Sequence, residues 1–114
     1  GLFIGTQAGS IALVAANSTA NLFMVHANGT SFFGGNVHPT ANNTQSLGTA
    51  NSRWMSIYTT NVVTGDINMS NEDSGGNKVD GTTGNWTIQE GENDLFLINN
   101  KTGRTYKFVL EEVI

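Results

Sequence analysis

The sequence predicts an all-β fold of short strands and β-hairpins, because three features of its 114 residues agree. The chain holds 15 Asn and 14 Gly, and both residue types are unfavourable in helix interiors. Its apolar runs have the length of strands and are separated by turn dipeptides, roughly every ten residues. Near the C-terminus, apolar and polar residues alternate with a period of two, as in a half-buried strand.

The first 40 residues predict small strands rich in Ala and Gly. We expect strands at Leu2–Ile4, Ser10–Ala15, Asn21–His26, Thr30–Phe33 and Asn36–His38. Asn28-Gly29 falls between two of these strands. Asn-Gly favours a type I′ hairpin turn, in which both central residues take positive φ.

Residues 41–84 are dominated by Asn, Thr, Ser and Gly, which predict loops. One apolar island stands among them at Trp54–Val63. We expect strands at Tyr58–Val63 and Asp66–Met69. The best helical signal is at Ser52–Ile57, where Trp54, Ile57 and Tyr58 could share a face for a turn or two.

Residues 85–114 predict a three-stranded meander with strands at Asn85–Glu90, Asp94–Asn99 and Arg104–Glu111. In the last strand Tyr106, Phe108 and Leu110 alternate with Lys107, Val109 and Glu111. Leu95 to Ile98 are four consecutive apolar residues, so both faces of that strand need cover. We therefore expect the meander to contact other chains as well as its own.

The composition excludes several classes of protein. The chain has no Cys, which rules out a disulfide-stapled mini-domain and a zinc module built on thiolates. A net charge of −4 without a basic cluster argues against nucleic-acid binding. No apolar stretch approaches the roughly 18 residues of a membrane span. Large apolar residues are too sparse for an ample monomer core, so we expect oligomerisation.

One segment carries a family resemblance. The run from Thr44 to Tyr58, Thr-Gln-Ser-Leu-Gly-Thr-Ala-Asn-Ser-Arg-Trp-Met-Ser-Ile-Tyr, resembles a signature of tailed-bacteriophage tail fibres and tailspikes, near the distal end of a trimeric fibre. Asn28 to Val37 is similar to the strand-turn repeats upstream of that signature. Gly84 to Gly91 and Tyr106 to Phe108 are similar to C-terminal segments of phage structural proteins. The resemblance implies an intertwined homotrimer in the virion, assembled in the host cytoplasm and acting extracellularly.

The chain departs from the family where many such fibres enter an endosialidase-type intramolecular chaperone that cleaves itself at a Ser-Asp-Arg-type junction. The corresponding stretch here, Met69 to Lys78, lacks that step and the basic run after it. Ser70 and Lys78 could form a Ser/Lys pair, but the Asn- and Gly-rich sequence between them gives no reason for a held geometry. We therefore expect that the chain has no enzyme activity and that it is a fragment of a longer fibre chain.

The chain is expected to divide into three parts. These are a thin β-strand segment at 1–63 containing the Leu47–Tyr58 signature, a loop region at 64–84 and the meander at 85–114.

Arg53, Trp54 and Tyr58 form the most conspicuous candidate cluster. Aromatic faces suit the apolar face of a sugar ring, so the cluster could bind a glycan. The alternative is a packing anchor, with Arg53 stacked on the indole, and we favour packing. The residues expected to make trimer contacts are Trp86, Ile88, Phe96, Ile98, Tyr106 and Phe108.

No metal ion or other cofactor is expected. Asp66 to Asp73 has oxygen ligands at alternate positions, but Asn71 and Asn77 stand where a calcium loop needs Gly and Glu. His26 and His38 each lack a second His two positions away, the spacing of fibre iron sites. Glu90, Glu92 and Asp94 fall in one expected turn, which does not suit an opposed catalytic pair.

These observations favour a structural virion protein, a part of a phage tail fibre that serves trimerisation and host-cell attachment. A bacterial surface glycan or an outer-membrane receptor is the expected further partner, without membrane insertion. The alternative is a stand-alone carbohydrate-binding β-module that recognises cell-surface glycans, because aromatic residues stand among Asn and Asp.

Overall fold

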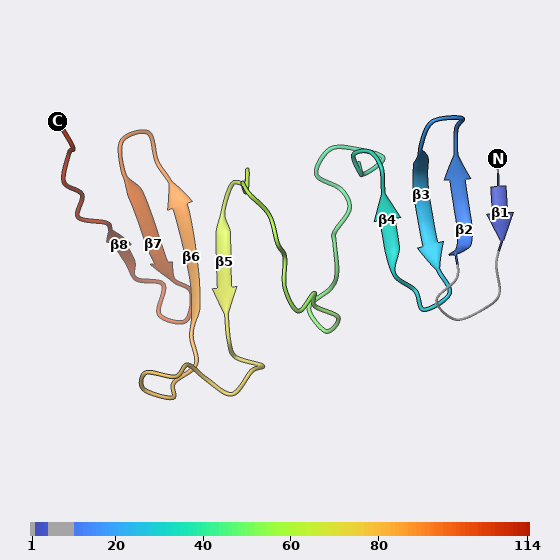
Figure 1. Cartoon of the computed structure of the whole chain (residues 1–114). Helices are drawn as coiled ribbons and strands as arrows, with labels where there is room; N and C mark the ends of the chain where they lie inside the picture. The colour runs from blue at the N-terminus through green and yellow to red at the C-terminus, as the bar shows by residue number, and fades with distance from the viewer. Residues whose placement is uncertain (1, 5–10) are drawn as a thin grey trace. The chain divides into compact units, whose positions relative to one another are not determined.

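The computed structural model describes residues 2–4 and 11–114, and all regular structure in these residues is β. The strands of the first sheet are β1 (Leu2–Ile4), β2 (Ile11–Ala16), β3 (Asn21–His26) and β4 (Ser31–Phe33). Those of the second are β5 (Ile67–Ser70), β6 (Asn85–Glu90), β7 (Leu95–Asn99) and β8 (Thr105–Lys107). Each sheet is antiparallel, with its strands in chain order (Figure 1). The all-β prediction is confirmed.

The chain divides into two compact units, at residues 1–55 and 56–114, with one sheet in each. In the first unit, Phe23 lies opposite Phe33 on the neighbouring strand, with ring centroids 5.0 Å apart. Met24 lies opposite Phe32 on the other face of the same strand pair. Both faces of the β3–β4 pair therefore carry apolar side chains, and Phe32 and Phe33 remain 49% and 58% exposed.

The turn between β3 and β4 differs from the expected type. The backbone N–H of Gly29 donates to the carbonyl of His26 at 2.9 Å, and that of His26 donates to Thr30 at 2.8 Å. Gly29 has φ of 91°, whereas Asn28 is not among the positive-φ residues of the described chain. The type I′ prediction is wrong, because a three-residue loop needs only its glycine in the left-handed region.

The second unit confirms the three-stranded meander and adds a fourth strand to it. β5 pairs with β6 from Ile67↔Ile88 to Ser70↔Asn85, and the loop at 71–84 connects these two antiparallel strands. β8 is shorter than predicted and ends at Lys107. The N–H of Phe108 still donates to the carbonyl of Leu95 at 3.0 Å, but Leu95 is the first residue of β7. Beyond it, the chain has no partner strand to pair with.

Two predicted strands, Asn36–His38 and Tyr58–Val63, do not form. Tyr58 and Val63 are almost fully exposed, at 97% and 101%. A strand needs a neighbour for its backbone N–H and C=O groups, and neither sheet extends to these segments. The helical signal at Ser52–Ile57 gives no helix either: a tight turn at Thr49–Ser52 ends where this segment begins, and residues 53–57 have no regular structure.

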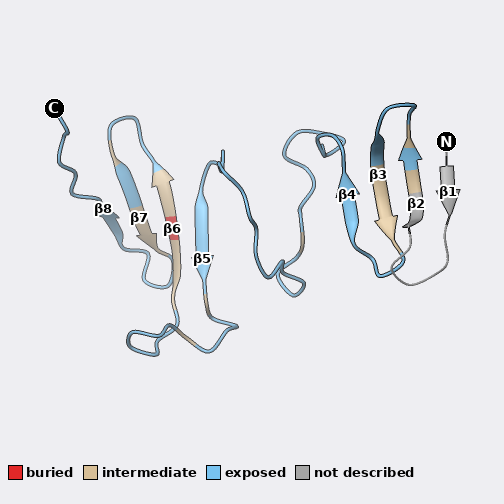
Figure 2. Ribbon diagram, in the orientation of Figure 1, coloured by how far each residue is buried: buried red, intermediate tan, exposed pale blue. Residues whose placement is uncertain are grey.

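Burial among residues 14–114 is slight. Thr87 on β6, 6% exposed, is the one buried residue in this range, and no hydrophobic side chain there is buried (Figure 2). The described parts of both sheets thus form without a buried apolar core.

Candidate functional site

The signature segment folds into a tight turn. The N–H of Thr49 donates to the carbonyl of Ser52 at 3.1 Å, and the N–H of Ser52 donates back to Thr49 at 3.2 Å. Gly48 enters this turn with φ of 83°, which residues with a Cβ rarely adopt. Thr49 and Ser52 form an isolated antiparallel bridge. Gly48 of the signature is therefore a conformational requirement of the turn.

Arg53 and Trp54 close over this turn. The Nε of Arg53 donates to the carbonyl of Ala50 at 3.2 Å. The indole of Trp54 packs at the bare Cα of Gly48, where an added Cβ would lie 3.4 Å from its Cδ1. Trp54 nevertheless remains 62% exposed. In this unit the two residues stabilise the turn, and the indole keeps an accessible surface.

Arg53 and Trp54 belong to the first unit, whereas Tyr58 belongs to the second unit, which begins at Ser56. Tyr58 is 97% exposed. A glycan-binding or packing cluster of these three residues stays a prediction.

The strand register places the six expected trimer-contact residues on two faces. Ile88, Leu97 and Tyr106 lie opposite one another across β6, β7 and β8, and directly opposed residues share a face. Because side chains alternate along a strand, Trp86 and Phe108 share this face. Phe96 and Ile98 lie on the other face of β7. The sequence proposed these residues as trimer contacts, which stays a prediction, and it did not show which of them share a face of the sheet.

Two polar features were not predicted from the sequence, and the first is centred on Thr87. Its hydroxyl donates to Oδ1 of Asn68 at 2.6 Å and accepts from Nδ2 of Asn100 at 2.9 Å. Asn100 also donates to Oδ1 of Asn85 at 2.9 Å. These residues form a polar network across β5, β6 and the turn after β7. Only the register, which the sequence does not display, brings them together.

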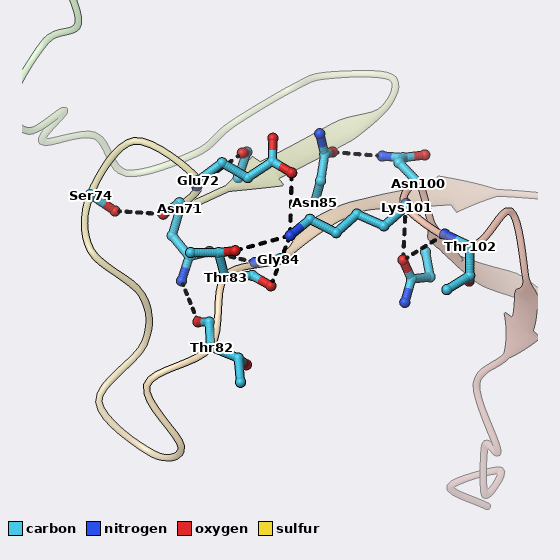
Figure 3. Close-up of polar contacts among 12 residues, drawn as sticks. Asn71, Glu72, Ser74, Thr82, Thr83, Gly84, Asn85, Asn100, Lys101 and Thr102 are labelled. Atoms are coloured by element: carbon cyan, nitrogen blue, oxygen red, sulfur yellow. Dashed lines mark hydrogen bonds and ion pairs between the residues drawn. The ribbon is translucent and has the colours of Figure 1, made fainter.

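The second missed feature is Lys101, whose ammonium group joins two loops (Figure 3). Its Nζ donates to Oγ1 of Thr83 at 2.9 Å and lies 3.4 Å from Oε1 of Glu72. Beside it, Asn71 and Gly84 close the base of the loop between β5 and β6. The N–H of Gly84 donates to Oδ1 of Asn71 at 2.7 Å. Lys101 therefore links the turn after β7 to that loop.

Within the loop at 71–84, Asp80 organises the backbone. Its Oδ1 accepts from the N–H of Thr82 at 3.0 Å, from the Thr82 hydroxyl at 2.7 Å and from Nδ2 of Asn77 at 2.7 Å. The bonds from Thr82, first that of its N–H, lower the pKa of Asp80 below its usual 3.8. The bond from Asn77 acts in the same direction.

Three of the other polar candidates, Asp66, Ser70 and Asp94, have structural partners in the sheet or its turns. Asp66 accepts from Nε2 of Gln89 at 2.8 Å, and Ser70 Oγ accepts from the N–H of Glu72 at 3.4 Å. Asp94 lies in the β6–β7 turn, 3.8 Å from Nζ of Lys107. Among the residues that the structure describes, no group of three or more His, Asp or Glu could hold a metal ion.

His26 lies on β3 against the ring of Phe32, with ring centroids 5.3 Å apart, while His38 is exposed in a loop.

Over residues 2–4 and 11–114, no helix is long and apolar enough to cross a membrane. No family model matches the chain, and no curated protein or solved structure shows significant similarity to it.

Proposed function

We propose that this chain is a structural part of a bacteriophage tail fibre, which assembles as a homotrimer and contributes to host-cell attachment. The observation that carries the proposal is the Thr44–Tyr58 segment, whose residues resemble the tail-fibre signature. Its local structure gives that pattern a physical role: Gly48 permits the turn, and Arg53 and Trp54 close over it. The protein then acts in the virion, outside the host cell, and is not an enzyme.

The exposed apolar surface supports the oligomeric part of the proposal. Half-exposed or fully exposed large apolar residues occur in both units, among them Phe33, Trp54, Ile67 and Tyr106. Exposed apolar residues in such number favour contact with other chains, because monomeric soluble proteins seldom expose large apolar patches. In a fibre built from repeated subunits, further copies of the same chain are the simplest partners to bury these apolar side chains.

The direct test combines a mass measurement with an adsorption assay. Light scattering should return about 36 kDa, three times 12.1 kDa, for the folded protein. A labelled sample should bind host bacteria and compete with phage adsorption. A folded protein of 12.1 kDa that binds no bacteria from a wide panel would refute the proposal.

A second candidate function is favoured by the exposure of Trp54. An indole that is 62% exposed beside the hydrogen-bonded turn offers a stacking surface for a sugar ring. A stand-alone carbohydrate-binding module would bind glycans as a monomer. A glycan array therefore separates the two, with Trp54→Ala as the variant that should lose binding and Met55→Ala, at a neighbouring exposed residue, as its control.

A further inference from the structure

A tripeptide with Gly and Thr after an Asn or Asp occurs twice in the chain, as Asn28-Gly29-Thr30 and as Asp80-Gly81-Thr82. The first joins β3 to β4, and the second lies in the loop between β5 and β6 (Figure 1). Nowhere else in the sequence does Gly follow Asn or Asp. Such dipeptides are prone to spontaneous backbone chemistry, because a glycine has no Cβ to shield its amide nitrogen from the preceding side chain.

At the first tripeptide, both groups that would have to react are hydrogen bonded. The N–H of Gly29 donates to the carbonyl of His26 at 2.9 Å, and Oδ1 of Asn28 accepts from the N–H of Thr30 at 3.0 Å. A third bond, from the N–H of His26 to the carbonyl of Thr30 at 2.8 Å, closes the loop. The turn therefore holds the backbone nitrogen and the side-chain amide in two separate hydrogen bonds.

The second tripeptide repeats this arrangement. The N–H of Gly81 donates to the carbonyl of Asn77 at 3.1 Å, and Oδ1 of Asp80 accepts from the N–H of Thr82 at 3.0 Å. Gly81 has φ of 75°, where Gly29 has 91°. One turn joins paired strands and the other lies within a loop, so the shared arrangement is local and does not depend on a sheet.

The reaction that concerns these dipeptides is closure of a succinimide ring. The backbone nitrogen of Gly29 loses its proton and forms a bond to Cγ of Asn28, the bond from Cγ to Nδ2 breaks, and ammonia leaves. Water then opens the ring at either of its two carbonyl carbons and leaves aspartate or isoaspartate at position 28. At Asp80 the same closure expels water instead of ammonia. Water is the only other reactant.

The hydrogen bonds of the folded turn oppose this closure. The nitrogen of Gly29 cannot attack while its proton is donated to His26, and the side chain of Asn28 must turn away from its present partner. Both bonds break only when the turn opens. Opening is made harder by the hairpin behind it, where the rings of Phe23 and Phe33 lie 5.0 Å apart.

We propose that Asn28 is a site of spontaneous deamidation that the folded β3–β4 turn protects, and that Asp80 is a site of isomerisation that its own turn protects in the same way. The inference goes beyond the proposed function, since it uses only contacts within one hairpin and one loop. Isoaspartate at position 28 would route the main chain through the β-carbon and add one atom to the turn. A chain that reacts while unfolded therefore cannot rebuild the same β3–β4 turn.

The test compares the folded chain with the chain unfolded in urea, at one temperature and neutral pH. Peptide mapping by mass spectrometry follows the mass change at position 28. We expect the folded chain to react more slowly by roughly tenfold or more, because a protected group reacts only through the open state. Asn28→Gln, whose longer side chain cannot close the same ring, should abolish the change. Equal rates in the folded and unfolded chains would overturn the proposal.

A second measurement relates the rate to the hairpin. Phe33→Ala removes the ring contact with Phe23 and leaves the tripeptide unchanged. It should raise the deamidation rate at Asn28 and the hydrogen-exchange rate of the Gly29 amide by the same factor. Val37→Ala, at an exposed residue outside the strands, is the control and should change neither. Faster exchange in Phe33→Ala without faster deamidation would overturn protection by the turn.

The Asp80 site has a test of its own. Thr82→Val keeps the backbone N–H but removes the hydroxyl that donates to Oδ1 of Asp80 at 2.7 Å. Isoaspartate at position 80 should then accumulate a few-fold faster than in the wild type, whereas the rate at Asn28, measured in the same sample, should not change. Equal accumulation at position 80 in variant and wild type would overturn the assignment of Asp80.

Discussion

The rings of Trp86 and Tyr106 lie with centroids 6.0 Å apart and planes inclined by 41°. Neither strand pairs with the other, because β7 lies between β6 and β8. The two rings therefore meet above β7, on the same face of the sheet. This contact connects the three-residue strand β8 to the centre of the sheet, which backbone pairing alone would hold weakly.

Replacing Tyr106 by Leu should lower the free energy of unfolding of the second unit by about 0.5–1.5 kcal/mol, because Leu preserves apolar cover but loses the aromatic pair. The measurement is urea unfolding followed by Trp86 fluorescence in a Trp54→Phe background, at fixed protein concentration. Thr105→Ser is the control on the same strand. A Tyr106→Leu variant as stable as its parent would contradict the role of the ring pair.

Thr87→Val should destabilise the second unit by about 1–3 kcal/mol, although Val matches Thr in shape. The substitution removes the hydroxyl that joins Asn68 and Asn100, and it leaves both amides without that partner. Thr87→Ser retains the hydroxyl and should lose much less. Thermal unfolding of the three proteins checks this order, and Thr105→Val, at an exposed site, should be close to neutral.

Gly48→Ala should distort the signature turn. At φ of 83° the added Cβ would lie 3.0 Å from the carbonyl oxygen of Ser52, so strain and crowding act together. We expect a loss of about 1–2 kcal/mol in the first unit and a changed Trp54 emission spectrum. Gly35→Ala is the matched control, since nothing lies within 4 Å of its added Cβ. An unaltered Trp54 spectrum in Gly48→Ala would show that the turn tolerates the change.

Lys101→Met should loosen the loop at 71–84 while leaving the sheet intact. The side chain loses its bonds to Thr83 and its ion pair with Glu72, whose members are 43% and 42% exposed. A pair this exposed stabilises by at most about 1 kcal/mol. Hydrogen exchange at the Gly84 amide should therefore accelerate a few-fold, and less so in high salt. Lys78→Met, elsewhere in the same loop, should leave that exchange rate unchanged.

The Asp80 loop should become less stable in acid. Because the folded state lowers the pKa of Asp80, its ionised form stabilises the loop fully above the unfolded value, and this contribution disappears as the pH falls through the folded pKa. An NMR titration of the Asp80 carboxyl should give a midpoint below 3.8. Asp80→Asn should remove the pH dependence of the Thr82 amide shift. A midpoint at or above 3.8 would contradict the hydrogen-bonded carboxylate.

Periodicity in the sequence predicted the elements that pair with neighbours on both sides. Asn21–His26 and Asn85–Glu90 form as predicted, because each combines β-forming side chains with a turn that returns the chain to its partner. Tyr58–Val63 has a similar local pattern and forms no strand. Its residues lack a strand to pair with, and local composition carries no record of that partner.

The candidate site was likewise predictable from the sequence only in part. The residues of the signature were recognisable in the sequence, as was the apolar content of the last meander. The Thr87 network and the Lys101 link were not, since their partners lie at sequence separations of 13 to 29 residues. Such contacts depend on which strand positions lie opposite each other.

The sequence by itself determined that the protein is β-structured, that its turns fall at Gly and Asn, and that Tyr106 and Phe108 share one side of a strand. Only the tertiary structure decided that Trp86 and Ile88 lie on that same side of the sheet, while Phe96 and Ile98 lie on the other. The reason is geometric. Alternation relates side chains within one strand, but the faces of different strands are related by register, and a shift of one residue would exchange them.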